Sequence, residues 1–258
     1  MPVRLDREGA VGLIVLDRPP VNSYDSQFAR DLAAAIDEAR LDDGIGCLVL
    51  RSASEKFFSA GADVKAFQGS APRQRWMTVL LMHEALRKLE TTPLLVIAEI
   101  NGHALGGGLE IALAADLRFA ANGDYKLGLP EVGLGLFPGN GGTQRLPRLV
   151  GKSRGLELIV KARTFSPEGA EKLGLVDRLF ETVDDLRSKT IEYAAEIADG
   201  PREAIGRAKL TAQLGYDAPL DLGNALEREA IGRVFVTEDA DEGIAAFFEK
   251  RQPKFKGA

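Results

Sequence analysis

The stretch NGHALGGGLEIALAADLRFA, from Asn101 to Ala120, places three consecutive glycines directly before an alanine-rich segment that carries one carboxylate, Glu110. The ten residues before it, TTPLLVIAEI, form a continuous apolar run typical of a buried strand. The pattern therefore predicts a strand, a glycine-rich turn and a helix in succession. Glycine loses more conformational freedom on folding than other residues, so three in a row indicate a place where the backbone must approach something closely.

The rest of the chain predicts an α/β core followed by helices alone. Apolar strands alternate with helical patterns, among them SQFARDLAAAIDEAR with Ser26 as a possible N-cap, and RQRWMTVLLMHEALRKLE with Trp76 near its apolar face. From about Asp184 onward only helical patterns remain. We expect residues 1–195 to form the core and residues 196–258 a helical C-terminal region.

Composition excludes several classes of function. The chain has 258 residues and a net charge of −5, and its basic residues are scattered, which argues against a nucleic-acid surface. The one cysteine, Cys47, lies in a strand-like apolar run, which predicts a thiol buried in the core, and it permits no disulfide framework within the chain. Two histidines make a histidine-based metal site improbable. No apolar stretch reaches the roughly 20 residues of a membrane span, and the N-terminus has no signal-peptide core. We expect a cytosolic or organelle-matrix protein without a metal, a nucleic-acid partner or a membrane partner, with a cytoplasmic location as the prediction.

Two phosphate-binding motifs fail in the glycine-rich segments. ALGGGLE lacks the Gly-Lys-Ser/Thr ending of a P-loop. PGNGGTQR offers spaced glycines but has Gln144 where a dinucleotide fingerprint needs its third glycine. Neither segment is therefore predicted to hold a nucleotide phosphate in that manner.

Two loops that follow strands predict a pair of backbone donors. FSAGAD, residues 58–63, and ALGGGLE, residues 104–110, each combine small residues with a helix start. Small residues let a peptide N–H reach a ligand oxygen, and a helix N-terminus adds positive potential. Two such groups that converge would form an oxyanion hole. The alternative is that both loops are plain tight turns.

Two carboxylates accompany these loops. Glu131 stands among apolar residues in LGLPEVGLGLFPGNGGTQRLPRLVG, residues 127–151, and Glu110 lies one turn into the glycine-led helix. A carboxyl group in apolar surroundings has a raised pKa and can transfer protons near neutral pH, and two such groups can divide the acid and base roles. The alternative is that Glu110 only interacts with the helix dipole and Glu131 is merely exposed.

Taken in order, these segments resemble the crotonase, or enoyl-CoA hydratase/isomerase, superfamily. The resemblance runs from RPPVN through FSAGADVKAF, the triple-glycine segment, the segment around Glu131 and SPEGAEKLGLVD to the terminal FFEKRQPKFKG, nearly the whole chain. It implies a spiral of ββα units and a helical C-terminal region that packs subunits into a homotrimer or a hexamer made of two trimers.

The resemblance also implies roles for individual residues. The N–H groups of Ala62 and Gly107 match the family's oxyanion hole, and Glu110 and Glu131 match the two acids of the hydratases. The pantetheine part of coenzyme A is expected beside the RPPVN and AGAD loops. The last helix, often that of a neighbouring subunit, is expected to contact the nucleotide end of coenzyme A. The residues expected to contact the acyl-CoA are Val21, Ala60, Ala62, Asp63, Val64, Gly106, Gly107, Phe247 and Lys250.

The implied function is that of an enoyl-CoA hydratase, which adds water to trans-2-enoyl-CoA in fatty-acid or other acyl-CoA degradation without a cofactor beyond the substrate's own coenzyme A. Isomerisation of an enoyl-CoA is the alternative reaction, and a non-catalytic acyl-CoA-binding protein is the alternative class. One departure from the family pattern stands out: where many relatives read Asn-Ala-Leu, this chain has Asn22-Ser23-Tyr24. A bulky tyrosine near the coenzyme A or acyl channel is expected to alter the preference for the acyl group. On this reading, a β-carbon at Gly107 would obstruct the thioester carbonyl.

Overall fold

The larger of two β-sheets forms the base of the molecule in the computed structural model, which describes residues 1–257. Its strand order is β1-β2-β3-β5-β7-β10, and every neighbouring pair is parallel except β1 and β2. The strands are β1 (Val3–Glu8), β2 (Val11–Leu16), β3 (Cys47–Ser52), β5 (Leu95–Ile100), β7 (Leu117–Ala121) and β10 (Arg178–Phe180).

A smaller second sheet receives the next strand of each repeating unit. Its order is β4-β6-β8-β9, with only β9 antiparallel to its neighbour. The strands are β4 (Phe57–Ser59), β6 (His103–Leu105), β8 (Leu127–Gly128) and β9 (Thr164–Phe165). The pairs β3/β4, β5/β6 and β7/β8 thus each place one strand in each sheet before the chain turns into helices, which confirms the expected spiral of ββα units.

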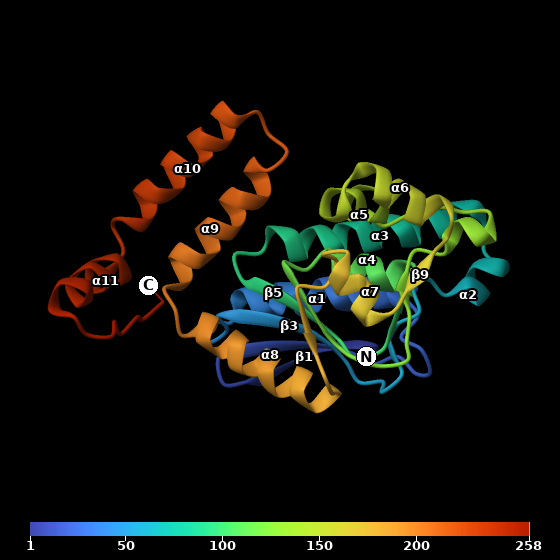
Figure 1. Ribbon diagram of the computed structural model, residues 1–258, viewed down its shortest axis with the longest axis horizontal. Coiled ribbons are helices and arrows are strands. Elements are labelled where there is room, and N and C mark those ends of the chain that lie inside the picture. Colours follow the sequence, from blue (N-terminus) through green and yellow to red (C-terminus); the bar gives the residue numbers. More distant parts are fainter. Residues whose placement is uncertain (258) are drawn as a thin grey trace.

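Helices cover both faces of the larger sheet (Figure 1). On one side α1 packs against α3, and on the other α8 packs on β3, β5 and β7. The helices of the core are α1 (Ser26–Leu41), α2 (Val64–Gln68), α3 (Pro72–Thr91), α4 (Gly107–Leu113), the 3₁₀ helix η1 (Glu131–Leu134), α5 (Gly142–Val150), α6 (Lys152–Val160), α7 (Pro167–Lys172) and α8 (Val183–Ala198). Two apolar clusters, one on each side of the sheet, form the core. The first contains α4, which is entirely buried and carries Glu110 into the interior.

Three local expectations are settled by packing and capping. Cys47 is a buried free thiol, as predicted. The N-cap of α1 is Asp25 rather than Ser26, because the Asp25 carboxylate accepts hydrogen bonds from the N–H groups of Gln27 and Phe28. Trp76 is 60% exposed, so its place on the apolar face of α3 is wrong. It lies in the first turns of α3, whose buried residues begin at Thr78.

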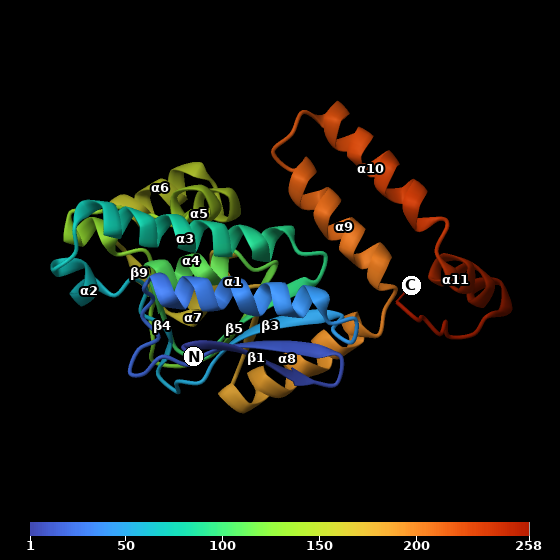
Figure 2. The same cartoon turned by 180° about the vertical axis from the view of Figure 1, so that it is seen from behind.

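The C-terminal helices extend away from the core as an arm (Figures 1 and 2). They are α9 (Arg202–Gly215), α10 (Leu220–Val234) and α11 (Glu238–Glu249). Lys209 anchors α9, since its buried ammonium donates to the carbonyls of Leu89 and Leu94 and pairs with Asp116 at 2.7 Å. Helix α10 packs on α9 and buries none of its own residues. The expected boundary between residues 195 and 196 lies within α8, and the division into two domains stays a prediction.

The arm presents a large apolar surface. Exposed apolar side chains on it include Leu220, Leu222, Ile231, Phe235, Val236, Ile244, Phe247 and Phe248. Soluble monomers rarely leave such a set uncovered. Within residues 1–257, no helix combines the length and the apolar character needed to cross a bilayer.

Candidate active site

The triple glycine forms the turn between β6 and α4. Gly106 is the N-cap of α4 and has φ of 53°, a left-handed conformation that favours glycine. Gly107 and Gly108 are already helical. Gly108 permits close packing, because a β-carbon there would lie 2.0 Å from the carbonyl oxygen of Ser59. Gly106 is therefore favoured by its backbone conformation, and Gly108 by close packing.

The structure adds a reason at Gly107 to the expected one. A β-carbon on Gly107 would point into the ring of Tyr24, 2.3 Å from Cε1. Packing against Tyr24 is thus a reason for glycine that the sequence did not suggest, and obstruction of the substrate stays a prediction. Because an aromatic ring occupies that side, the absence of a side chain at Gly107 allows Tyr24 to pack against the peptide backbone.

The AGAD loop lies directly against this turn. A β-carbon on Gly61 would be 2.9 Å from the backbone nitrogen of Gly107, so the two loops are in contact next to Ala62. Among residues 1–257, neither the N–H of Ala62 nor that of Gly107 donates to any protein acceptor. The first N–H groups of a helix have no partner within the helix, and Gly107 begins α4. Two neighbouring, unengaged donors, one of them at the N-terminus of α4, fit an oxyanion hole.

Glu110 is fixed by the loop before α5. It is 1% exposed, and its Oε1 accepts the peptide N–H groups of Asn140 and Gly142, both at 2.7 Å. Burial raises the pKa of Glu110, while these two hydrogen bonds and the charge of Arg145 act in the opposite direction. The carboxylate is thus held in one orientation by donors that favour its ionised form.

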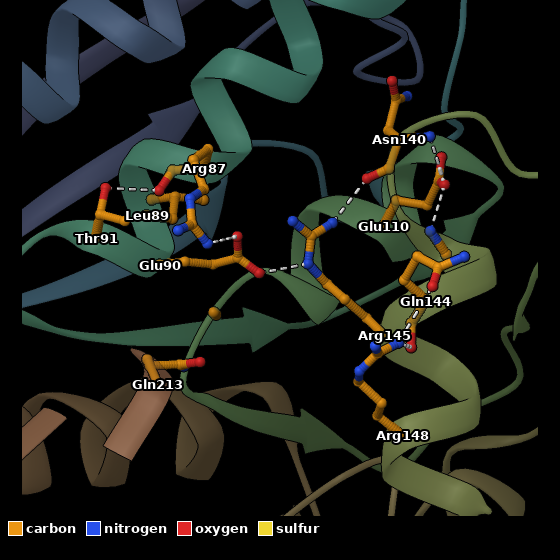
Figure 3. A network of polar contacts seen from close by, with 12 residues as sticks. Arg87, Leu89, Glu90, Thr91, Glu110, Asn140, Gln144, Arg145, Arg148 and Gln213 are labelled. Atoms are coloured by element: carbon orange, nitrogen blue, oxygen red, sulfur yellow. Dashed lines mark hydrogen bonds and ion pairs between the residues drawn. The ribbon is translucent and has the colours of Figure 1, made fainter. Parts of the chain in front are cut away.

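A polar network supports this loop from behind (Figure 3). Arg145 on α5 donates to the carbonyl oxygen of Asn140 at 2.7 Å and pairs with Glu90 on α3 at 2.7 Å. The guanidinium therefore ties the loop that holds Glu110 to the neighbouring long helix.

Glu131 has a different environment. It begins η1, and its Oε1 would lie 2.9 Å from a β-carbon on Gly106, so the carboxyl group sits against the glycine turn. Its Oε2 is buried and has no hydrogen-bond partner among residues 1–257. Burial raises the pKa of Glu131 to about 7, and the nearby charge of Glu110 adds to the effect. The structure thus brings the two carboxyl groups together, one held by donors and one poised to carry a proton.

The expected substrate-binding loops are also adjacent. The N–H of Ala60 donates to the carbonyl of Val21 at 2.9 Å, joining the RPPVN and AGAD segments. Asp63 caps α2 and pairs with Arg18, so its carboxylate supports the loop. Val64 is exposed at the start of α2. The contact of these positions with substrate stays a prediction.

Phe247 and Lys250 lie elsewhere in the chain. Both are at the end of α11, at the far end of the arm from α4 (Figure 1). Phe247 is 79% exposed. A single chain therefore does not bring these residues to Glu110 and Glu131, which leaves the route through a neighbouring subunit as the prediction for them.

Sequence reasoning missed the groups that hold Glu110. Asn140 and Gly142 belong to PGNGGTQR, to which the sequence analysis assigns no contact with Glu110. The glycines around Asn140 were the available signal, because such a loop exposes peptide N–H groups. Within residues 1–257 no group of three potential metal ligands comes together.

Comparison with known proteins gives the family. A family model described as enoyl-CoA hydratase/isomerase matches residues 6–258. The chain belongs to this family, the crotonase family. The short-chain-enoyl-CoA hydratase of Clostridium acetobutylicum is 36% identical over 97% of this chain and 95% of its own. The crotonyl-CoA hydratase of Syntrophomonas wolfei is 33% identical over 97% of this chain and 96% of its own. The crystal structure of an enoyl-CoA hydratase from Bacillus anthracis superposes with a TM-score of 0.95 at 37% identity and covers all of both chains. This crotonase-family chain therefore has the fold of that structure and aligns with nearly the whole length of the two sequence relatives.

Proposed function

We propose that this protein is an enoyl-CoA hydratase that reversibly adds water to trans-2-enoyl-CoA to give 3-hydroxyacyl-CoA. The observation that carries the proposal is the pairing of Glu110 and Glu131 beside the free N–H groups of Ala62 and Gly107. The names of the relatives support the same reaction class. A place in fatty-acid or other acyl-CoA degradation follows from this substrate.

The chemistry divides among these four groups. The N–H groups of Ala62 and Gly107 bind the thioester oxygen and stabilise the negative charge that develops on it. Glu110, as the ionised group, takes a proton from water while the water oxygen bonds to the β-carbon and the π electrons move toward the thioester oxygen. Glu131 then delivers its proton to the α-carbon as the thioester carbonyl is restored. Delivery from the same side makes the addition syn, and the thioester is the electron sink, so the mechanism requires no resident cofactor.

Assembly is part of the proposal. The apolar arm of α9 to α11 fits a surface buried between subunits in a homotrimer or a hexamer of two trimers. Such packing would allow Phe247 and Lys250 of one subunit to approach the coenzyme A bound by another. We propose a cytoplasmic location, without nucleic-acid or membrane partners.

Turnover of crotonyl-CoA by the purified protein tests the function. We expect loss of the enoyl thioester absorbance and formation of 3-hydroxybutyryl-CoA. Incubation with a 3-enoyl-CoA tests isomerisation, which needs proton transfer between carbons but no attack by water. Turnover of only the 3-enoyl substrate would establish the isomerase alternative, and binding of both thioesters without turnover would establish a non-catalytic acyl-CoA-binding protein.

A further inference from the structure

Tyr24 connects the parts of the site in a way that neither the general family pattern nor the proposed mechanism includes. Its backbone pairs with the AGAD loop: the N–H of Tyr24 donates to Gly61 at 2.8 Å, and the N–H of Asp63 donates to Tyr24 at 2.9 Å. Ala62, the first proposed oxyanion donor, lies between these two hydrogen bonds. The backbone of Tyr24 therefore helps to set the position of the Ala62 peptide.

The side chain of Tyr24 reaches the other oxyanion donor. It is only 3% exposed, and its ring packs so closely on Gly107 that no β-carbon could be accommodated there. Its hydroxyl oxygen would be 3.0 Å from such a β-carbon. The ring thus lies beside the peptide that begins α4, with its hydroxyl directed past Gly107 toward the loop before α5.

The hydroxyl of Tyr24 meets Asn140. The side-chain amide of Asn140 donates to the Tyr24 oxygen, and the peptide N–H of the same asparagine donates to Glu110. Asn140 is completely buried. A buried residue with hydrogen bonds at both its side chain and its backbone has little freedom to turn, so the tyrosine hydroxyl restrains the peptide group that orients Glu110.

We propose that Tyr24 is a positioning residue of this active site: its hydroxyl holds Asn140, and Asn140 in turn holds the carboxylate of Glu110. The proposal rests on the proposed function only in assigning Glu110 as the base. It differs from an effect on acyl preference, because it places the action of Tyr24 on the protonation and orientation of Glu110.

The charges around Glu110 determine the sign of the expected effect. The charges of Arg145 and His83 favour the ionised form of Glu110, as do the two peptide hydrogen bonds. The neighbouring acid is the carboxyl group of Glu131. Burial and the charge of Glu110 raise the pKa of Tyr24, so its hydroxyl stays protonated and neutral. Loss of the hydroxyl leaves Asn140 less restrained and weakens its hydrogen bond to Glu110. The pKa of Glu110 should then rise, because a donor to the ionised form has been lost.

The experiment compares wild type with Tyr24→Phe, which keeps the ring on Gly107 and removes the hydroxyl. For crotonyl-CoA hydration, we expect the acid limb of the kcat/KM profile to move up by about half a pH unit, roughly a threefold change in acid constant. The same shift is expected by NMR titration of protein labelled with ¹³C at the glutamate side-chain carboxyl carbons, with Glu110→Gln used to assign the signal. The titration does not require turnover. If the wild type does not hydrate crotonyl-CoA but Tyr24→Phe still raises the pKa of Glu110 in the titration, the positioning role is supported and the proposed hydratase function is rejected.

Asn140→Ala provides a second, independent variant. It removes the side-chain amide but keeps the peptide N–H, so it should shift the pKa of Glu110 in the same direction as Tyr24→Phe. The double variant should shift it no further, because both changes break the same hydrogen bond. Additive shifts in the double variant would contradict action through Asn140.

Tyr125→Phe is the matched control. The Tyr125 hydroxyl is also buried and donates to the carbonyl of Ala121, with the carbonyl oxygen of Ile100 at 3.0 Å, so its loss should lower the melting temperature. It should leave the pKa of Glu110 and the acid limb unchanged. If Tyr24→Phe lowers the melting temperature but leaves both the NMR pKa and the acid limb in place, Tyr24 has only a structural role and the proposal is overturned.

Discussion

The carboxyl group of Glu131 lies against Gly106, where a β-carbon would be 2.9 Å from Oε1. The left-handed glycine that allows the chain to enter α4 also makes room for the proposed proton donor. Backbone conformation and chemistry are therefore linked at one residue.

Glu110→Gln and Glu131→Gln should each lower kcat for crotonyl-CoA hydration by at least about 10²-fold, because general acid–base catalysis contributes about 10²–10⁴. Affinity for the coenzyme A thioester should change little, since neither side chain is assigned to bind coenzyme A. Glu171→Gln, at an exposed position, is the control. A rate within a few-fold of wild type would remove the tested residue from the mechanism.

Hydration should show a bell-shaped dependence of kcat/KM on pH. Glu110 must be ionised, so the rate rises as it loses its proton. Glu131 must be protonated, and its pKa of about 7 makes the rate fall above neutral pH. The remaining activity of Glu131→Gln should lack that alkaline limb. An unchanged alkaline limb in this variant would assign the limb to another group.

Glu131 should also affect stability in a pH-dependent way. Its pKa is higher in the folded state than the ordinary value of 4.5, so folding disfavours the ionised form and stability is lost as pH rises toward and through 7. The free energy of unfolding of Glu131→Gln minus that of wild type should therefore increase from pH 5 to pH 8. The increase should be about 1 kcal/mol once solvent screening is allowed for. Urea unfolding of both proteins at pH 5 and at pH 8 measures this difference in stability. The same difference at the two pH values would contradict the raised pKa of Glu131.

Gly108→Ala should destabilise the fold by about 1–3 kcal/mol, because its β-carbon would lie 2.0 Å from the rigid carbonyl of Ser59. Thermal and urea unfolding measure the loss. Gly69→Ala is the matched control, since nothing lies within 4 Å of a β-carbon there and its φ is negative. Equal stability of the two variants would show that α4 and β4 are less closely packed than the structure indicates.

Removal of residues 220–258 should dissociate or unfold the protein. The full chain should be a trimer or hexamer by light scattering, because α10 buries none of its residues and α11 exposes two adjacent phenylalanines. A milder variant, Phe235→Glu, should weaken assembly while the core stays folded. A fully active monomer of the complete chain would contradict the proposed assembly.

Much of the fold was determined by the sequence itself. The apolar run of β5, the triple glycine and the apolar face of α1 predicted their elements because each pattern depends on local propensity and periodicity. The order of the motifs identified the family, and the type and spacing of Glu110 and Glu131 predicted both candidate acids. These features are local or sequential, so a linear sequence can carry them.

The groups that act on these residues could be found only from the folded arrangement of the chain. Asn140 reaches Glu110 from a distant loop, the ring of Tyr24 occupies the space beside Gly107, and Ser59 explains Gly108. These contacts depend on how two sheets and their helices are packed, and no local pattern encodes them. The pKa of Glu131 is likewise set by burial and by the neighbouring carboxylate, because desolvation is a property of the assembled site and not of the residue's place in the chain.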